Sequence, residues 1–308
     1  MEERQLKGKF TRIPNNLIKG DSELDSKELT ILILLYMSRN SKDVCIFNLE
    51  WLYAELHIKP NNSTGKKQIR EIIKSLYEYE ILFYYDDIYL QQEYNINNIV
   101  TDYDKNKLIF AELCEEIGDN FTMLLDKEIN LLIEYSNKNK VDTYSLIKTY
   151  AYISSTFNNN KNDEDYCLGY PSVLNIAERV EVTEKTALKY INILSELNIF
   201  VFDYAGYKET SKGQIKNGHM YYTRVGNEDL LLQKLTSERK KKGYIKISKI
   251  NKDKSNFKKQ IKQKINDLIK KKGNGQANII DIEKLRLLQE QYEELDKQKE
   301  EKKTNENA

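Results

Sequence analysis

One order of elements occurs twice along this chain of 308 residues, and it constrains the fold more than any single motif does. A predicted helix is followed by a short β-prone run, two more helices separated by a turn, and two further β-prone runs. This order favours a compact helical unit with a small β-hairpin, repeated once. In the first copy these elements include Leu29–Met37, Val44–Phe47, and a tight hairpin of Ile81–Tyr85 and Ile88–Leu90 around Asp86 and Asp87. The second copy occupies residues 142–225.

Capping residues mark where most of these helices begin. Asp25 stands three residues before Glu28, which predicts a capping box at the start of the first helix. Only 3 prolines and 12 glycines occur, against about 15 and 20 in an average chain of this length, so long helices are the default expectation. The side chains expected to cap the later helices are those of Asn48, Asp142, Ser172 and Thr183.

The third helix of the first copy has one apolar face and one basic face. Its apolar residues recur at the spacing of a single helical face, and they are Ile69, Ile72, Ile73 and Leu76. Helix, turn, helix and hairpin in this order is the winged-helix arrangement, in which the second helix of the pair presents side chains to the major groove. We therefore predict DNA contacts from the opposite face of this helix, through Lys66, Lys67, Arg70 and Lys74.

Two readings stay open for this basic helix. An ordinary solvated helix face also carries lysines, so the basic residues alone do not decide the question. At the helix start, outward-pointing backbone N–H groups suit phosphate oxygens. The residues there either contact phosphate or only form the turn and the cap, and they are Asn61, Asn62, Ser63 and Thr64.

The second copy is less basic on its third helix than the first. Lys185 and Lys189 share one side of that helix, but Glu178, Glu181 and Glu184 lie nearby in sequence and would repel phosphate. DNA contact and a structural or dimerisation role are both open for this unit. The loop that follows is a flexible basic wing suited to the DNA backbone or a minor groove, and its lysines are Lys208, Lys212 and Lys216.

The fold class expected is mainly α with small β-hairpins (α+β), organised as two winged-helix domains plus a helical basic C-terminal tail. We expect the first winged-helix domain over residues 8–95 and a helical connector over 96–120, with an amphipathic stretch around Leu108–Ile117. The second winged-helix domain is expected over 121–230. Residues 231–308 should hold a basic helix, a short coiled-coil-like helix and a disordered end.

Charge is distributed very unevenly, although the formal net charge of the chain is only +1. Residues 238–272 hold 15 Lys or Arg against 3 Asp or Glu, a net charge of +12, whereas residues 1–237 sum to −8 and residues 273–308 to −3. A basic segment of this kind adds salt-dependent, non-specific DNA affinity. A solvated tail and a helix on an anionic membrane surface are the alternatives.

Signatures of an enzyme are nearly absent from the sequence. No phosphate-binding glycine loop, dinucleotide-binding glycine pattern or His-Glu-x-x-His motif occurs. The three cysteines, Cys45, Cys114 and Cys167, are too far apart for a zinc knuckle and are expected to be reduced. The polar N-terminus and the short apolar runs predict a cytoplasmic protein with no membrane partner. We expect no catalytic residues, no cofactor and no metal.

Three segments carry a resemblance to a known family. Phe10–Pro14, the helix Leu29–Met37 and the later Thr183–Leu194 resemble the winged-helix modules of replication initiators and replisome organisers from plasmids and phages of low-GC Gram-positive bacteria. The resemblance covers residues 8–226. It implies a non-catalytic protein that recognises repeated origin sequences in double-stranded DNA as a homodimer, together with replication-machinery proteins. Two features depart from a protein with two equivalent DNA-binding units. The turn of the first hairpin is acidic, at Asp86 and Asp87, and the third helix of the second copy is only weakly basic.

The function expected from the sequence is therefore sequence-specific binding of double-stranded DNA at origin repeats, which initiates or organises plasmid or phage replication. Transcriptional regulation of a mobile element is the alternative within DNA binding. A protein-interaction adaptor whose winged helices bind other proteins is the alternative outside it.

Overall fold

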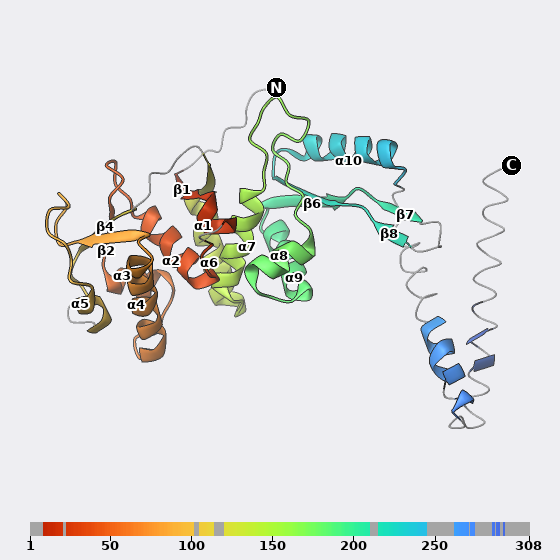
Figure 1. The fold of residues 1–308 in the computed structure, drawn as a ribbon, viewed down its shortest axis with the longest axis horizontal. Coiled ribbons are helices and arrows are strands. Elements are labelled where there is room, and N and C mark those ends of the chain that lie inside the picture. Colours follow the sequence, from red (N-terminus) through yellow and green to blue (C-terminus); the bar gives the residue numbers. More distant parts are fainter. Residues whose placement is uncertain are drawn as a thin grey trace. The chain divides into compact units, whose positions relative to one another are not determined.

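The computed structural model of this protein describes residues 9–20, 23–101, 105–113, 120–209, 215–244, 262–270 and 272–274, and single positions between 285 and 292. They form mainly helical structure with small antiparallel sheets, as the sequence predicts (Figure 1). Two compact units are present. The larger contains residues up to 205 together with 217–243, and the smaller contains residues 206–216 together with those from 244 onward.

The first half of the larger unit consists of three principal helices and a three-stranded antiparallel sheet. The side chain of Asp25 accepts hydrogen bonds from the backbone of Lys27 and Glu28, so the predicted capping box is confirmed. The strands lie in the order β2-β4-β3. In chain order these elements are α2 (Ser26–Met37), β2 (Cys45–Phe47), α3 (Leu49–Glu55), α4 (Ser63–Glu78), β3 (Leu82–Tyr85) and β4 (Ile109–Leu113).

The predicted tight hairpin is wrong. Ile88–Leu90 forms no strand, and β3 pairs instead with β4, where Tyr85 lies opposite Phe110. Asp87 ends the strand by accepting backbone hydrogen bonds from Tyr89, Gln91 and Gln92. The loop between the two strands is therefore long, and it contains the short helix α5 (Ile96–Thr101).

The expected connector over residues 96–120 does contain a helix, α5, but its amphipathic stretch around Leu108–Ile117 is not helical where the structure describes it, because residues 109–113 form β4. Ile109 and Ala111 are buried while Phe110 and Glu112 are half-buried. This alternation has the period of a strand, which a short apolar run does not distinguish from a helix turn. Part of the expected helical connector thus completes the first sheet, and the domain division itself stays a prediction.

The second half of the larger unit repeats the order of the first. The predicted caps Asp142, Ser172 and Thr183 are all confirmed by hydrogen bonds to backbone N–H groups. Gly169 bridges Tyr222 in the same way that β2 pairs with β4 in the first half. The elements are α6 (Asp126–Asn139), α7 (Thr143–Ser155), α8 (Val173–Val180), α9 (Glu184–Glu196), β6 (Phe200–Tyr204) and β9 (Met220–Arg224), with β6 and β9 antiparallel.

A further helix, α10 (Glu228–Lys242), belongs to this half rather than to a tail beginning at residue 231. Leu231 and Leu235 are buried, and the helix packs against β6 and β9. Beyond it, residues 262–270 are helical, as expected for the basic segment. The described positions among 285–292 are helical too, and the end expected to be disordered lies outside the described residues.

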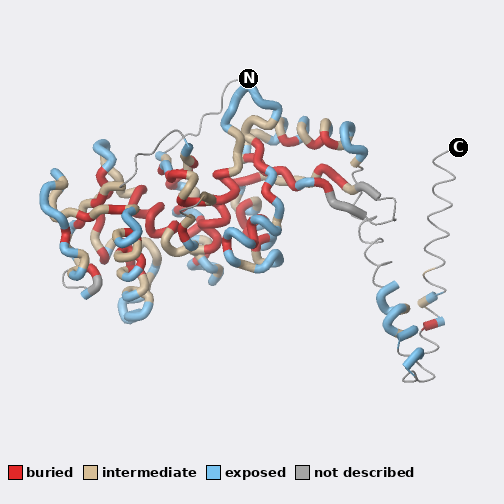
Figure 2. The backbone as a smooth tube through the Cα atoms, viewed as in Figure 1, coloured by how far each residue is buried: buried red, intermediate tan, exposed pale blue. Residues whose placement is uncertain are grey.

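The two halves are joined through a shared core. The strand β1 (Phe10–Pro14) pairs with β5 (Phe121–Leu125), and α1 (Asn15–Lys19) packs with α2 against α7. Figure 2 shows buried residues running through this central region. The Lys148 ammonium on α7 is buried and donates to the Leu24 carbonyl at 2.8 Å.

None of the helices among the described residues has the length and apolar character that a membrane crossing requires.

Candidate nucleic-acid interface

Helix α4 has the two faces that its sequence predicts. Ile69, Ile73 and Leu76 are fully buried against the core of the first half. On the other side Lys67 is exposed, whereas Lys66, Arg70 and Lys74 are half-buried. The half-buried state means that the basic residues are held at the edge of the helix face rather than free in solvent.

Tyr53 on α3 holds two of these cations. The Arg70 guanidinium donates from Nη1 to the Tyr53 hydroxyl at 3.2 Å, and the Lys66 ammonium lies 5.3 Å from the centre of the Tyr53 ring. Tyr53 is otherwise buried, so it forms a fixed platform beneath both side chains. Fewer rotamers then remain to be ordered when Lys66 and Arg70 meet an anion.

The other two basic side chains of α4 form ion pairs along the helix. Lys67 lies 3.5 Å from Glu71 and Lys74 lies 3.1 Å from Glu78, both at the i, i+4 spacing. Exposed pairs of this kind contribute about 0.3–0.5 kcal/mol each, so a phosphate oxygen can replace the carboxylate at little cost. Both lysines therefore remain available to DNA in this arrangement.

The start of α4 is capped by one of the four residues that the sequence singles out, and phosphate contact there stays a prediction. The Asn62 side chain caps the helix by accepting from the Gly65 N–H at 2.9 Å. A Cβ atom on Gly65 would stand 2.7 Å from Asn62 Nδ2, so a larger residue there would require the capping side chain to shift. All four predicted residues are exposed around this helix end, and they are Asn61, Asn62, Ser63 and Thr64.

Helix α9 presents a mixed surface. Lys185 and Lys189 are exposed, and Leu188 between them is 38% exposed. Glu178 and Glu181, at the end of α8, are exposed as well. The surface of α8 and α9 therefore combines cations, carboxylates and an apolar side chain, and both DNA contact and a structural or dimerisation role stay predictions for it.

The basic wing is in part a hairpin rather than a flexible loop. β7 (Tyr207–Glu209) and β8 (Ile215–Asn217) form a two-stranded sheet, which apart from Asn217 belongs to the smaller unit. Lys208 lies on the first strand and Lys216 on the second, while Lys212 lies outside the described residues. Two of the three predicted wing lysines therefore lie on paired strands.

Tyr53 is the residue of this surface that sequence reasoning missed. In the sequence Tyr53 is one of several apolar residues of a short helix. Its contacts with Arg70 and Lys66 depend on how α3 packs against α4. A polar hydroxyl on an otherwise apolar helix face, preceding a basic helix, is the only signal the sequence offers for it.

No group of three or more His, Cys, Asp or Glu side chains among the described residues is placed to hold a metal ion. Cys45 is buried, and burial raises the pKa of its thiol to about 12. The thiolate, which is the form that acts as a nucleophile or metal ligand, therefore does not form near neutral pH. Cys167 is half-buried, and Cys114 lies outside the described residues.

Comparison with known proteins does not assign the chain to a family. No family model matches it, and no curated protein shows significant similarity to its sequence.

Proposed function

We propose that this protein binds double-stranded DNA sequence-specifically through winged-helix units. The proposal is supported by the order of elements in the first half, in which a helix, a strand and a helix-turn-helix are followed by two strands that complete the sheet. In this sheet β4, the last of the three strands along the chain, lies between β2 and β3. The second half repeats this arrangement with α7, α8, α9, β6 and β9.

One observation carries the proposal furthest: the Tyr53 hydroxyl and ring position Arg70 and Lys66 on the exposed side of α4. In a helix-turn-helix the first helix braces the second, whose side chains enter the major groove. Here α3 supplies the brace and α4 the basic reading surface. Arginine in a fixed orientation can form a bidentate pair with guanine, whereas Lys67 and Lys74 suit phosphates.

The second half takes a supporting part in this proposal. Its α9 lysines and its wing lysines add contacts to the DNA backbone, while the acidic end of α8 limits non-specific binding. A protein-interaction role for this half is the second candidate. It is favoured by Leu174 on α8 and Leu188 on α9, which are 50% and 38% exposed.

We further propose that the DNA sites are origin repeats of a plasmid or phage, and that the protein initiates or organises replication there as a homodimer. This finer proposal rests on the resemblance carried by Phe10–Pro14, Leu29–Met37 and Thr183–Leu194. Transcriptional regulation of a mobile element would use the same surface. Footprints on repeats needed for replicon maintenance support initiation, and footprints confined to promoters support regulation.

The variant Lys67→Ala/Arg70→Ala tests the assignment of α4. It should weaken binding to a selected DNA fragment and reduce the slope of log K against log salt by about one, because the phosphate-directed Lys67 is lost. The loss of Arg70 should in addition relax the preference for the selected sequence. The matched control is Lys127→Ala/Lys138→Ala, which removes the same charge from exposed positions on α6. Gel-shift titrations at several salt concentrations provide the measurement.

Equal losses in the two double variants would mean that overall charge, and not α4, determines affinity. Unchanged affinity in the α4 variant would remove this helix from the interface. Absence of binding to any fragment of the native replicon at about 100 mM salt, where non-specific contacts are largely screened, would favour the adaptor function.

A further inference from the structure

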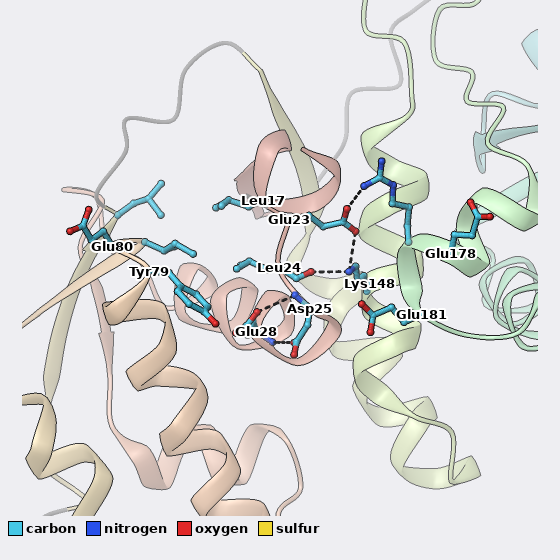
Figure 3. Close-up of a pocket in the computed structure, with 13 residues that line it drawn as sticks. Leu17, Glu23, Leu24, Asp25, Glu28, Tyr79, Glu80, Lys148, Glu178 and Glu181 are labelled. Atoms are coloured by element: carbon cyan, nitrogen blue, oxygen red, sulfur yellow. Dashed lines mark hydrogen bonds and ion pairs between the residues drawn. The ribbon is translucent and has the colours of Figure 1, made fainter. Parts of the chain in front are cut away.

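A cleft of about 1000 Å³ lies in the larger unit, on a surface that the proposed DNA contacts do not use. Figure 3 shows Tyr79 and Glu80, at the end of α4, on one side of it and Glu178 and Glu181, at the end of α8, on the other. The segment leading into α2 lies between them. The cleft is therefore built from both halves of the protein.

The cleft is strongly acidic. Six carboxylates line it, against two cations, Lys148 and Arg179. Both cations are already paired with a single carboxylate, that of Glu23, which lies 3.1 Å from the Lys148 ammonium and accepts a hydrogen bond from the Arg179 guanidinium. Asp25 and Glu28 accept backbone hydrogen bonds in the capping box at the start of α2, so the carboxylates left to face an incoming group are Glu80, Glu178 and Glu181.

Helix ends add to this negative potential. Helix α4 ends at Glu78 and α8 ends at Val180, so both direct the negative end of their dipoles toward this region. Helix α4 has no basic residue in its last turn to offset that end, whereas α8 has Arg179 and the N-terminus of α2 at Asp25 directs a positive end to the same cleft. A cation is favoured at such positions, whereas a phosphate backbone is repelled.

The floor of the cleft is partly apolar. Leu17 and Leu24 are buried there, and Ile81 and Leu113 are half-buried. Tyr79 at the rim is 61% exposed, which leaves its ring face accessible to a guanidinium or ammonium group. An occupant that matches both features carries several positive charges and at least one apolar side chain.

The arrangement of the carboxylates distinguishes among cations. They do not converge into a group that could hold a metal ion among the described residues. They are instead distributed over both walls of the cleft and the segment between them, as Figure 3 shows. An extended polycation can meet such dispersed charges, whereas a single ion can meet only one or two of them.

We propose that this cleft is a docking site for a Lys/Arg-rich peptide segment of a partner protein, seated with an apolar side chain against Leu17 and Leu24. Three features together favour a peptide that carries several positive charges and an apolar side chain. They are the negative charge of the walls, the apolar floor and the exposed ring of Tyr79. The site is separate from the basic face of α4, and its existence does not depend on DNA binding.

The test uses the full chain and a fluorescein-labelled peptide of three Lys-Lys-Leu-Arg repeats, titrated by fluorescence anisotropy. The variant Glu80→Gln/Glu178→Gln should weaken binding about tenfold, since each exposed ion pair contributes a factor of up to about five. The matched control Glu134→Gln/Glu196→Gln makes the same charge change at exposed positions of α6 and α9 and should alter binding less than about twofold.

Two further measurements address the apolar and aromatic parts of the site. Tyr79→Ser should weaken binding about threefold through the lost cation–π contact. A peptide with serine in place of leucine should bind several-fold more weakly to the unaltered protein.

The proposal is overturned if the peptide does not bind, or if the control variant weakens binding as much as the cleft variant. Equal affinity for the serine peptide would overturn it as well, because binding would then follow charge alone. All of the substituted positions are exposed, and circular dichroism of each variant checks that the fold is retained.

Discussion

Arg224 shows at the scale of one residue how the second half is held together. Its guanidinium lies 2.6 Å from the Glu128 carboxylate and 5.8 Å from the centre of the Tyr150 ring, and its side chain is only 14% exposed. The Tyr150 hydroxyl donates to the same carboxylate at 2.6 Å and accepts from the Leu125 N–H. Burial raises the pKa of Tyr150, so this hydroxyl keeps its proton for the network.

The variant Arg224→Met should lower the free energy of unfolding by about 3–5 kcal/mol, because it leaves the largely buried Glu128 carboxylate without its cationic partner. Urea denaturation provides the measurement. The double variant Glu128→Leu/Arg224→Met removes both charges and should recover a large part of that loss. A single variant that costs less than about 1 kcal/mol would contradict this account of the network.

The proposed DNA surface was partly predictable at the same scale. Lys66, Lys67 and Arg70 follow from the helical period of α4, because the buried Ile69 and Ile73 fix which side faces solvent. The platform formed by Tyr53 could not be predicted, since it depends on the packing of α3 against α4. Local periodicity indicates a side chain's direction, but not which neighbour it meets.

Single elements differ in how well their sequences specify them. Helices α2, α7, α8 and α9 were predictable because each begins at a capping residue and carries its own apolar pattern. The partner of β3 was not, because β4 follows only after a long loop containing α5. Pairing between distant strands depends on chain closure, which no local pattern encodes.

Helix α10 offers a test of how one element docks. The carboxylate of Glu238 is nearly buried, and it lies 2.6 Å from the Lys242 ammonium and 3.9 Å from that of Lys234. Burial alone would raise the pKa of Glu238, but the hydrogen bond and charge of Lys242, with help from Lys234, lower it below its ordinary value.

A lowered carboxyl pKa in the folded state stabilises the protein above the unfolded pKa of about 4.3, and this stabilisation is lost as the pH falls below it. Glu238→Gln should therefore cost about 1–3 kcal/mol at pH 7, with the difference from the unaltered protein shrinking toward pH 3. Urea titrations at several pH values measure this. A difference that stays constant with pH would assign the loss to packing alone.

At the scale of the whole molecule, α10 defines where the basic tail can be removed. Residues 244–308 hold 17 Lys or Arg against 11 Asp or Glu, a net charge of +6, and a cut after Gly243 leaves α10 intact. Deleting them should reduce affinity for unrelated DNA more than the preference for a selected fragment, because the tail's contacts are electrostatic. Competition gel shifts against unrelated DNA measure both quantities.

Deleting only residues 273–308 gives an internal control, since that segment carries a net charge of −3. Affinity for unrelated DNA should then stay unchanged or rise. A loss of sequence preference with non-specific affinity intact, after the longer deletion, would assign the tail to recognition instead of general attraction.

The pairing of β1 with β5 has a consequence for how the protein is made. The two strands are separated by more than a hundred residues, which include the whole first half. At about 5–20 residues per second, a ribosome needs about 5–20 seconds to synthesise that interval. Throughout it β1 has no strand to pair with, although the helices of the first half can already form. The strand β1 is therefore synthesised before the first half but reaches its final position only after that half is complete.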